Sequence, residues 1–229
     1  KYNFGIFLMN KKKNLIWLMH NGYFDRLAYG EKPNMFIFDT GTIIDLESAY
    51  YNNGKIIAHD TAYLLSKIER EHYIIFPELV MKEIKIHRES FRNNHLEISS
   101  STIVFINSIY EDNINFFERF GHNNLSERLK DYHRYAVFSA AQEAFKDDYK
   151  KGFIDPISRT DKETIGLALD MSKLNQIEKG LGAINVLSSD NHLLKTINVI
   201  KNGNYFKESF QDYSIRAINS RSDIRSYLS

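Results

Sequence analysis

The hydrophobic residues of this chain follow two patterns that alternate from residue 35 onward. Short continuous apolar runs occupy 35–38 and 73–76, and runs of this length predict strands that are buried on both faces of a sheet. A third strand is expected over 183–187, which is apolar except for Asn185. Between these runs, apolar residues recur at intervals of three and four, which is the spacing of a helix with one buried face. The alternation predicts an α/β protein with three layers, in which helices cover both faces of a mostly parallel central sheet.

The remaining periodic segments predict where the helices lie. The long segment 101–149 reads as helical throughout, and a break at 121–124 divides it into an inserted helical hairpin. Two further strands are expected, near 198–201 and 214–218. Other helices are expected near 43–46, over 58–70, 78–92 and 162–173, and in a short segment from 191.

Charge divides the chain into two parts. Residues 1–34 contain six Lys or Arg and two acidic residues, whereas the whole chain has a formal net charge of only +1. We therefore expect a basic N-terminal extension over 1–34 and one domain over 35–229. A basic arm could contact a polyanion, but a solvated or packed extension is the more common use of such a segment.

Composition removes several classes of function. The chain has no Cys, which excludes disulfide scaffolds, thiolate metal sites and Cys nucleophiles. No apolar stretch approaches the roughly 18 residues that a membrane-spanning helix needs, so we expect a cytoplasmic protein without membrane contact. The sequence also lacks a Gly-rich phosphate loop, a His-Glu-x-x-His motif and a Gly-x-Ser-x-Gly motif.

Four carboxylates stand where the chemistry of a parallel sheet is usually found, just beyond the carboxyl ends of the strands. Asp39 ends the first strand and Asp190 follows the third. Asp161 opens a predicted helix, and Glu83 lies nearly two turns into the helix after the second strand. We expect these four side chains to converge on one edge of the sheet.

Three of these acids also have a structural explanation. Asp39 and Asp190 stand at positions typical of helix N-caps, and Ser158-x-x-Asp161 fits a capping box. Glu83 fits no capping role, although it could be a solvated helix residue. Caps alone do not explain why all four acids fall at the same predicted edge, so both interpretations stay open for each residue.

A cluster of four carboxylates predicts a bound cation. Like charges raise one another's pKa unless something positive neutralises them. Oxygen ligands in a chain without Cys favour a hard ion, Mg²⁺ or Mn²⁺, which binds readily to phosphate oxygens. The reaction class that follows is hydrolysis of a phosphodiester by a metal-activated water.

The same residues resemble the PIN-domain nuclease family, whose motifs occur here in the family's order. Gly41 stands where the family commonly has Asn, and Asn191 where a second acid often follows. The resemblance covers 35 to about 200 and rests on four segments: Ile37-Phe38-Asp39-Thr40-Gly41, Pro77-Glu78-Leu79-Val80-Met81-Lys82-Glu83, Ser158-Arg159-Thr160-Asp161 and Val186-Leu187-Ser188-Ser189-Asp190.

The resemblance implies an Mg²⁺- or Mn²⁺-dependent endoribonuclease that acts on RNA. Asp39, Glu83, Asp161 and Asp190 would hold the metal, and Thr40 and Ser188 would support these acids or contact phosphate. Many members are toxins of toxin–antitoxin pairs and others process RNA. An antitoxin or other inhibitory protein, and a second copy of the chain, are therefore possible partners.

Basic residues near the predicted site suit a substrate with a charged backbone. Arg88 and Arg92 lead away from Glu83 on the same helix, and Arg159 and Lys162 flank Asp161. Two alternatives share these features. One is a non-catalytic PIN-like module that binds nucleic acid or serves as a scaffold; the other is a DNA flap-type nuclease with the same metal site.

Overall fold

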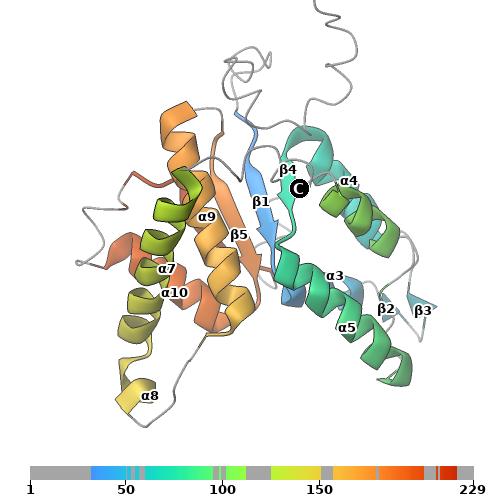
Figure 1. Ribbon diagram of the computed structural model, residues 1–229. Helices are drawn as coiled ribbons and strands as arrows, with labels where there is room; N and C mark the ends of the chain where they lie inside the picture. Colours follow the sequence, from blue (N-terminus) through green and yellow to red (C-terminus); the bar gives the residue numbers. More distant parts are fainter. Residues whose placement is uncertain are drawn as a thin grey trace, which may run out of the picture.

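A computed structural model of the 229-residue chain gives the arrangement of the domain (Figure 1). The residues that the structure describes are 32–49, 51–52, 55–56, 60–94, 98, 102–111, 125–150, 157–178, 181–203, 210 and 212–220. The predicted extension over 1–34 therefore lies almost wholly outside the described residues.

The centre of the domain is a four-stranded parallel sheet. The strand β1 (Met35–Phe38) lies between β4 (Tyr73–Ile75) and β5 (Ile184–Ser188), and β6 (Ile215–Asn219) pairs with the other side of β5. All residues of β1, β4 and β5 are buried, as continuous apolar runs predict. Among the described residues, every pairing in this sheet is parallel, which confirms the predicted class.

Alternate residues of the strands face two separate hydrophobic clusters, one on each side of the sheet. Met35 and Ile37 of β1 belong to the first cluster, whereas Phe36 and Phe38 belong to the second. Burial of a side chain of this size contributes about 1.5–3 kcal/mol. The first cluster is covered by α7 (Leu125–Ala144), α9 (Arg159–Glu178) and α10 (Asn191–Asn202), and the second by α3 (Thr40–Ala49), α4 (Asp60–Glu71), α5 (Glu78–Asn94) and a helix over 102–111.

The structure differs from the sequence-based expectation in the segment 101–149. Its first helix, over 102–111, packs into the second cluster through Ile106 and Ile109. Its second helix, α7, packs into the first cluster through Val137 and Ala140 on the opposite face of the sheet. The described helices of the predicted hairpin are thus separated by the sheet, and the short α8 (Lys146–Lys150) follows α7.

Two other local differences concern short strands. Residues 198–201, predicted as a strand, continue α10 because Leu193, Leu194, Ile197 and Ile200 are buried at helical spacing. The second difference is a two-stranded antiparallel ribbon of β2 (Tyr51–Asn52) and β3 (Lys55–Ile56), which the apolar pattern did not indicate.

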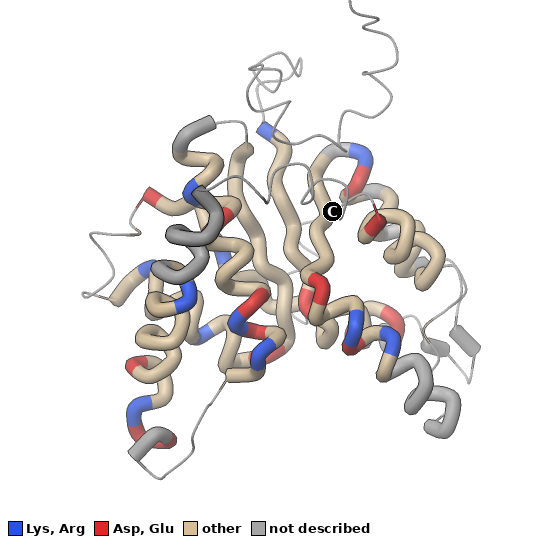
Figure 2. The backbone as a smooth tube through the Cα atoms, in the orientation of Figure 1, with Lys and Arg blue, Asp and Glu red and all other residues tan. Residues whose placement is uncertain are grey.

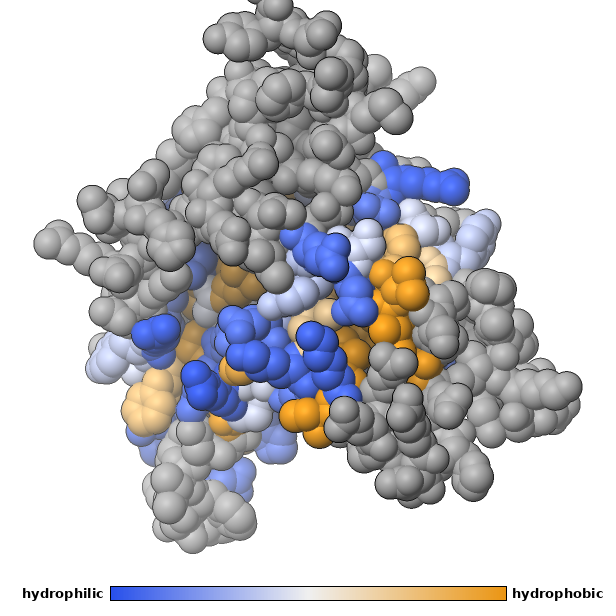
Figure 3. All heavy atoms as spheres, turned by 45° about the vertical axis from the view of Figure 1, so that its right-hand side comes forward, coloured by the Kyte–Doolittle hydropathy of each residue, from blue (hydrophilic) through white to orange (hydrophobic). Residues whose placement is uncertain are grey.

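Most large apolar side chains of the described residues are buried, and those left at the surface are few. Hydrophilic residues cover the middle of the face shown in Figure 3, and a smaller apolar area lies beside them. None of the described helices is long and apolar enough to cross a membrane. Among the described residues, the exposed large hydrophobic side chains are Tyr63, Ile86, Val104, Tyr135 and Phe138.

Candidate metal and nuclease site

The carboxyl edge of the sheet has a feature that favours a binding site at β1 and β5. The chain leaves β1 through α3 and α4 on one face to reach β4, whereas it leaves β5 through α10 on the other face to reach β6. In parallel sheets, ligands commonly bind beside the carboxyl ends of two adjacent strands whose connections depart to opposite faces. Asp39 follows one of these strands and Asp190 follows the other.

The four predicted carboxylates come to this edge from four separate segments. The negative charges of Asp161 and Glu83 help to raise the pKa of Asp39. The negative charges of Asp190 and Glu83 in turn help to raise the pKa of Asp161. Figure 2 shows acidic and basic residues gathered at the same end of the sheet. Each of the four side chains therefore lies within electrostatic range of at least one other at this edge of the sheet.

Asp39 is the most constrained of the four acids. Its side chain is buried, its Oδ1 accepts a hydrogen bond from the backbone N–H of Thr40 at 2.8 Å, and its Oδ2 accepts one from Ser188 Oγ at 2.8 Å. Burial raises the pKa of Asp39 to about 6, and the charges of Asp161 and Glu83 add to the rise, while the bonds from Ser188 and Thr40 oppose it. The geometry holds a carboxylate in a place that disfavours its charge.

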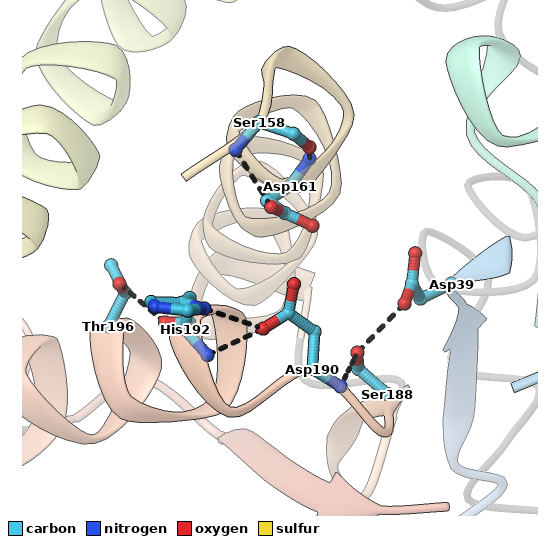
Figure 4. A network of polar contacts seen from close by, with 7 residues as sticks. All are labelled: Asp39, Ser158, Asp161, Ser188, Asp190, His192 and Thr196. Atoms are coloured by element: carbon cyan, nitrogen blue, oxygen red, sulfur yellow. Dashed lines mark hydrogen bonds and ion pairs between the residues drawn. The ribbon is translucent and has the colours of Figure 1, made fainter. Parts of the chain in front are cut away.

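Ser188 connects Asp39 to Asp190. Its hydroxyl donates to Asp39 and accepts the backbone N–H of Asp190 at 2.9 Å (Figure 4). Asp190 is the N-cap of α10, because its Oδ1 accepts the backbone N–H of His192 at 2.7 Å. The His192 ring also lies beside this oxygen, with Nδ1 at 3.2 Å. The capping interpretation of Asp190 is correct, and the same residue still reaches the cluster.

Asp161 has a similar double role at the start of α9. Its Oδ2 accepts the backbone N–H of Ser158 at 2.9 Å, and its own N–H donates to Ser158 Oγ at 3.0 Å, which is the predicted capping box. Burial raises the pKa of Asp161, and the nearby charges of Asp190 and Glu83 raise it further, against the hydrogen bonds from Ser158. In Figure 4 the Asp161 carboxylate faces Asp190, with Asp39 opposite.

Glu83 is held by two threonine hydroxyls. Thr40 Oγ1 donates to Glu83 Oε2 at 2.7 Å, and Thr160 Oγ1 donates to Glu83 Oε1. Thr40 follows Asp39 and Thr160 precedes Asp161, so Glu83 links the two segments that carry the buried acids. Thr160 was not singled out from the sequence; its position next to Asp161 was the available signal.

The donor set fits a hard divalent cation in its chemistry. Among the described residues, no Lys, Arg or His forms an ion pair with Asp39, Glu83 or Asp161. Two buried carboxylates that lack a positive partner favour either protonation or a bound cation. Within the described part of the chain, however, no three acidic or His side chains are placed closely enough to ligate one ion together. A site with one or two carboxylate ligands and several waters, which Mg²⁺ commonly uses, is the arrangement that stays open to these residues.

The predicted substrate-binding residues are only partly described. Arg159 is exposed at the first position of α9, and Lys162 is partly exposed one turn later, so both lie close to Asp161 in the chain. Arg88 and Arg92 belong to α5, but their side chains lie outside the described residues. Thr40 and Ser188 bond to carboxylates, as the supporting role requires.

Gly41 occupies a confined position beside Asp39. A Cβ atom at this position would lie 3.1 Å from Ser189 Oγ and 3.3 Å from Asp39 Oδ2. A side chain here would therefore press on the carboxylate that Ser188 and Thr40 hold in place. The first turn of α3 is packed against Asp39 so closely that glycine is the residue that fits without displacement.

Comparisons with known proteins do not identify a family for this chain. A scan against protein-family models, a search of curated proteins and a search of solved structures found no significant match. The function therefore has to be inferred from the site itself.

Proposed function

We propose that this chain is a divalent-metal-dependent endoribonuclease that hydrolyses phosphodiester bonds in RNA, and that it is PIN-like. The observation that carries the proposal is the pair of buried carboxylates, Asp39 and Asp161, at the carboxyl edge of the sheet beside β1 and β5. Neither has an ion-pair partner among the described residues, and the negative charge of Asp161 helps to raise the pKa of Asp39. A cation would neutralise both and would bring a phosphate group to the same place.

In this proposal each residue has a defined task. Asp39 and Asp161 would hold Mg²⁺ or Mn²⁺ together with water, and the more exposed Asp190 would lie beside the ion without ligating it directly. Ser188 fixes the orientation of Asp39. Glu83, bonded to Thr40 and Thr160, keeps the two acid-bearing segments at a constant separation or joins the ligands.

The bound ion supplies two effects that the chain itself lacks: it lowers the pKa of a bound water and it offsets negative charge on the phosphate. The residues of the chain bind and orient the reacting groups. The exposed Arg159 offers a positive charge to a neighbouring phosphate, because it has no ion-pair partner among the described residues.

A non-catalytic nucleic-acid-binding or scaffold module is the second candidate. The observation in its favour is that all four acids already accept hydrogen bonds within the protein, and that Asp161 and Asp190 cap helices. This candidate predicts binding of Mn²⁺ or nucleic acid without any cleavage. A DNA flap-type nuclease is distinguished by a preference for DNA flaps or duplexes over single-stranded RNA.

Cleavage of labelled single-stranded RNA and DNA in the presence of Mn²⁺ tests the proposal. We expect RNA cleavage that EDTA abolishes, with products that carry 5′-phosphate and 3′-hydroxyl ends. Asp161→Asn should lower the rate about 100-fold or more, since one removed charge-stabilising group costs this much in comparable sites. Asp212→Asn, an exposed acid outside the site, is the matched control and should leave the rate unchanged. RNA cleavage by Asp161→Asn at the parent rate would contradict the proposal.

The biological setting of a toxin or an RNA-processing factor is a separate part of the proposal. A toxin would arrest growth when expressed without an antitoxin, and the Asp39→Asn variant would not. Normal growth with confirmed expression of the active protein would favour a processing role. A homodimer would appear as twice the monomer mass in light scattering.

A further inference from the structure

A buried phenylalanine joins the carboxylate cluster to the neighbouring surface of α10. Phe145, between α7 and α8, is 8% exposed. The His192 ring packs against it with ring centroids 4.8 Å apart, and Lys195 Nζ lies 4.8 Å from the centroid of the same ring. His192 and Lys195 are three residues apart on α10 and therefore project from the same side of the helix.

Lys195 carries a positive charge that the described residues leave unpaired. It is exposed, and it forms no ion pair with any of them. In addition, α10 contains Lys195 and Lys201 but no acidic residue. The contact with the Phe145 ring stabilises the position of the ammonium group without neutralising its charge.

A continuous series of contacts connects this charge to the candidate site. Asp190 contacts His192, His192 packs on Phe145, and Phe145 lies beneath Lys195. The position of Lys195 is therefore tied to the position of Asp190, one of the four clustered carboxylates. A phosphate bound by Lys195 would lie on the side of α10 that also carries His192, next to Asp190.

We propose that Lys195, positioned by the Phe145 ring, binds a backbone phosphate of single-stranded RNA adjacent to the phosphate at the carboxylate cluster. The strand then crosses the amino-terminal end of α10. Lys195 acts as a point charge for a phosphate, which is recognised without regard to base sequence. The identity of the strand as RNA rests on the proposed function, whereas the phosphate contact does not depend on cleavage.

The test is binding of a fluorescein-labelled single-stranded RNA, measured by anisotropy over a series of KCl concentrations. The full chain carries Asp39→Asn and the buffer contains EDTA, so that cleavage does not interfere. Lys195→Gln should weaken binding about 3- to 10-fold and reduce the slope of log K against log [KCl] by about 0.7, the value for one lost phosphate contact with a single strand.

Two further variants make the result specific. Lys201→Gln removes the same charge from the last turn of the same helix and should change neither affinity nor slope. Phe145→Leu keeps an apolar side chain but removes the aromatic ring, and should weaken binding in the same direction as Lys195→Gln. Equal Lys195 dependence with single-stranded DNA would support a backbone contact.

The outcomes separate this inference from the proposed function. Binding that depends on Lys195, in a protein that cuts no RNA with Mn²⁺, would support the phosphate contact and contradict the nuclease proposal. If the protein cuts RNA but Lys195→Gln and Lys201→Gln bind it with equal affinity, the nuclease proposal would be supported and the phosphate contact contradicted. Failure of the parent protein to bind single-stranded RNA would also overturn the inference.

Discussion

Two of the groups of polar side chains that the described residues bury differ in how their charges are balanced. The first surrounds His133 of α7, which is fully buried: its Nδ1 contacts Asp170 of α9, and its Nε2 lies 3.2 Å from the Tyr213 hydroxyl. The second is the carboxylate cluster around Asp39 and Asp161. Within the described residues, the acid of the first group has a basic partner and the buried acids of the second have none.

Under the proposed function, this difference separates a structural group from one that binds a cation. The partly buried Asp170 and the buried His133 imidazole form a self-contained pair, and aromatic rings pack against His133, with Tyr213 edge-on at 5.9 Å. Buried acids without a positive partner lower stability, and a chain that keeps them gains by binding a cation. The same substitution, Asp to Asn, should therefore change stability in opposite directions at the two places.

The largest stability effect is expected at the self-contained pair. Asp170→Asn leaves the buried His133 without its charged partner, and we expect a loss of about 2 kcal/mol in the free energy of unfolding, measured by urea denaturation. Asp212→Asn, at an exposed acid, is the control and should stay within about 0.5 kcal/mol of the parent. Equal stability of these two variants would show that the His133–Asp170 contact contributes little.

The next effect has the opposite sign. Asp39→Asn removes a buried charge, so we expect the free energy of unfolding to rise by about 1–2 kcal/mol in EDTA at pH 7. Each unit by which burial raises the pKa corresponds to about 1.4 kcal/mol, and the amide recovers only part of the hydrogen bonding of the carboxylate.

The pH dependence of this gain follows from the raised pKa of Asp39. In the parent protein the ionised Asp39 lowers the free energy of unfolding by its full amount above about pH 6. This destabilisation decreases as the pH falls toward 4, because the Asp39 carboxylate takes up its proton at a higher pH in the folded state than in the unfolded state. The gain from Asp39→Asn should therefore be largest above pH 6 and disappear near pH 4. If the stability gained by Asp39→Asn does not vary with pH, removal of the Asp39 charge is not the cause of the gain.

The smallest stability effect is expected at Gly41, where activity should respond instead. Ala is favoured over Gly inside a helix, but the new Cβ would press on Asp39 and on Ser189. We expect Gly41→Ala to change stability by less than about 1 kcal/mol, because these two terms oppose each other. RNA cleavage should fall several-fold, since the Asp39 carboxylate would have to move. Parent activity in Gly41→Ala would argue that the position of Asp39 tolerates displacement.

Much of the fold could be predicted because its central strands are continuous apolar runs. Met35–Phe38 and Tyr73–Ile75 carry no polar residue, so their burial on both faces is apparent from the sequence alone. The segment 198–201 misled the analysis because Val199 and Ile200 are adjacent apolar residues, as in a strand, and the helical spacing emerges only when Leu193 and Leu194 are included. The separation of the helices in 101–149 depends on which face each one covers, and periodicity does not contain that information.

The candidate site was predictable to the extent that its acids follow strands or open helices. Asp39, Asp161 and Asp190 stand at such positions, where the fold class brings residues together. Thr160 and the group around His133 were missed, since their partners are distant in the chain: Thr160 and Glu83 are 77 residues apart, and His133 and Tyr213 are 80 apart. Such pairs have no local pattern.

The most direct test of the account is the effect of Mn²⁺ on the thermal unfolding of the full chain at pH 7. If the clustered carboxylates await a cation, saturating Mn²⁺ should stabilise the protein by about 2–3 kcal/mol at 100 times the Kd, a rise of about 5–10 °C in Tm. Asp39→Asn and Asp161→Asn should each lose most of that rise, while Asp170→Asn should retain it. An equal Tm with and without Mn²⁺ in the parent protein would contradict the central claim that these acids form a metal site.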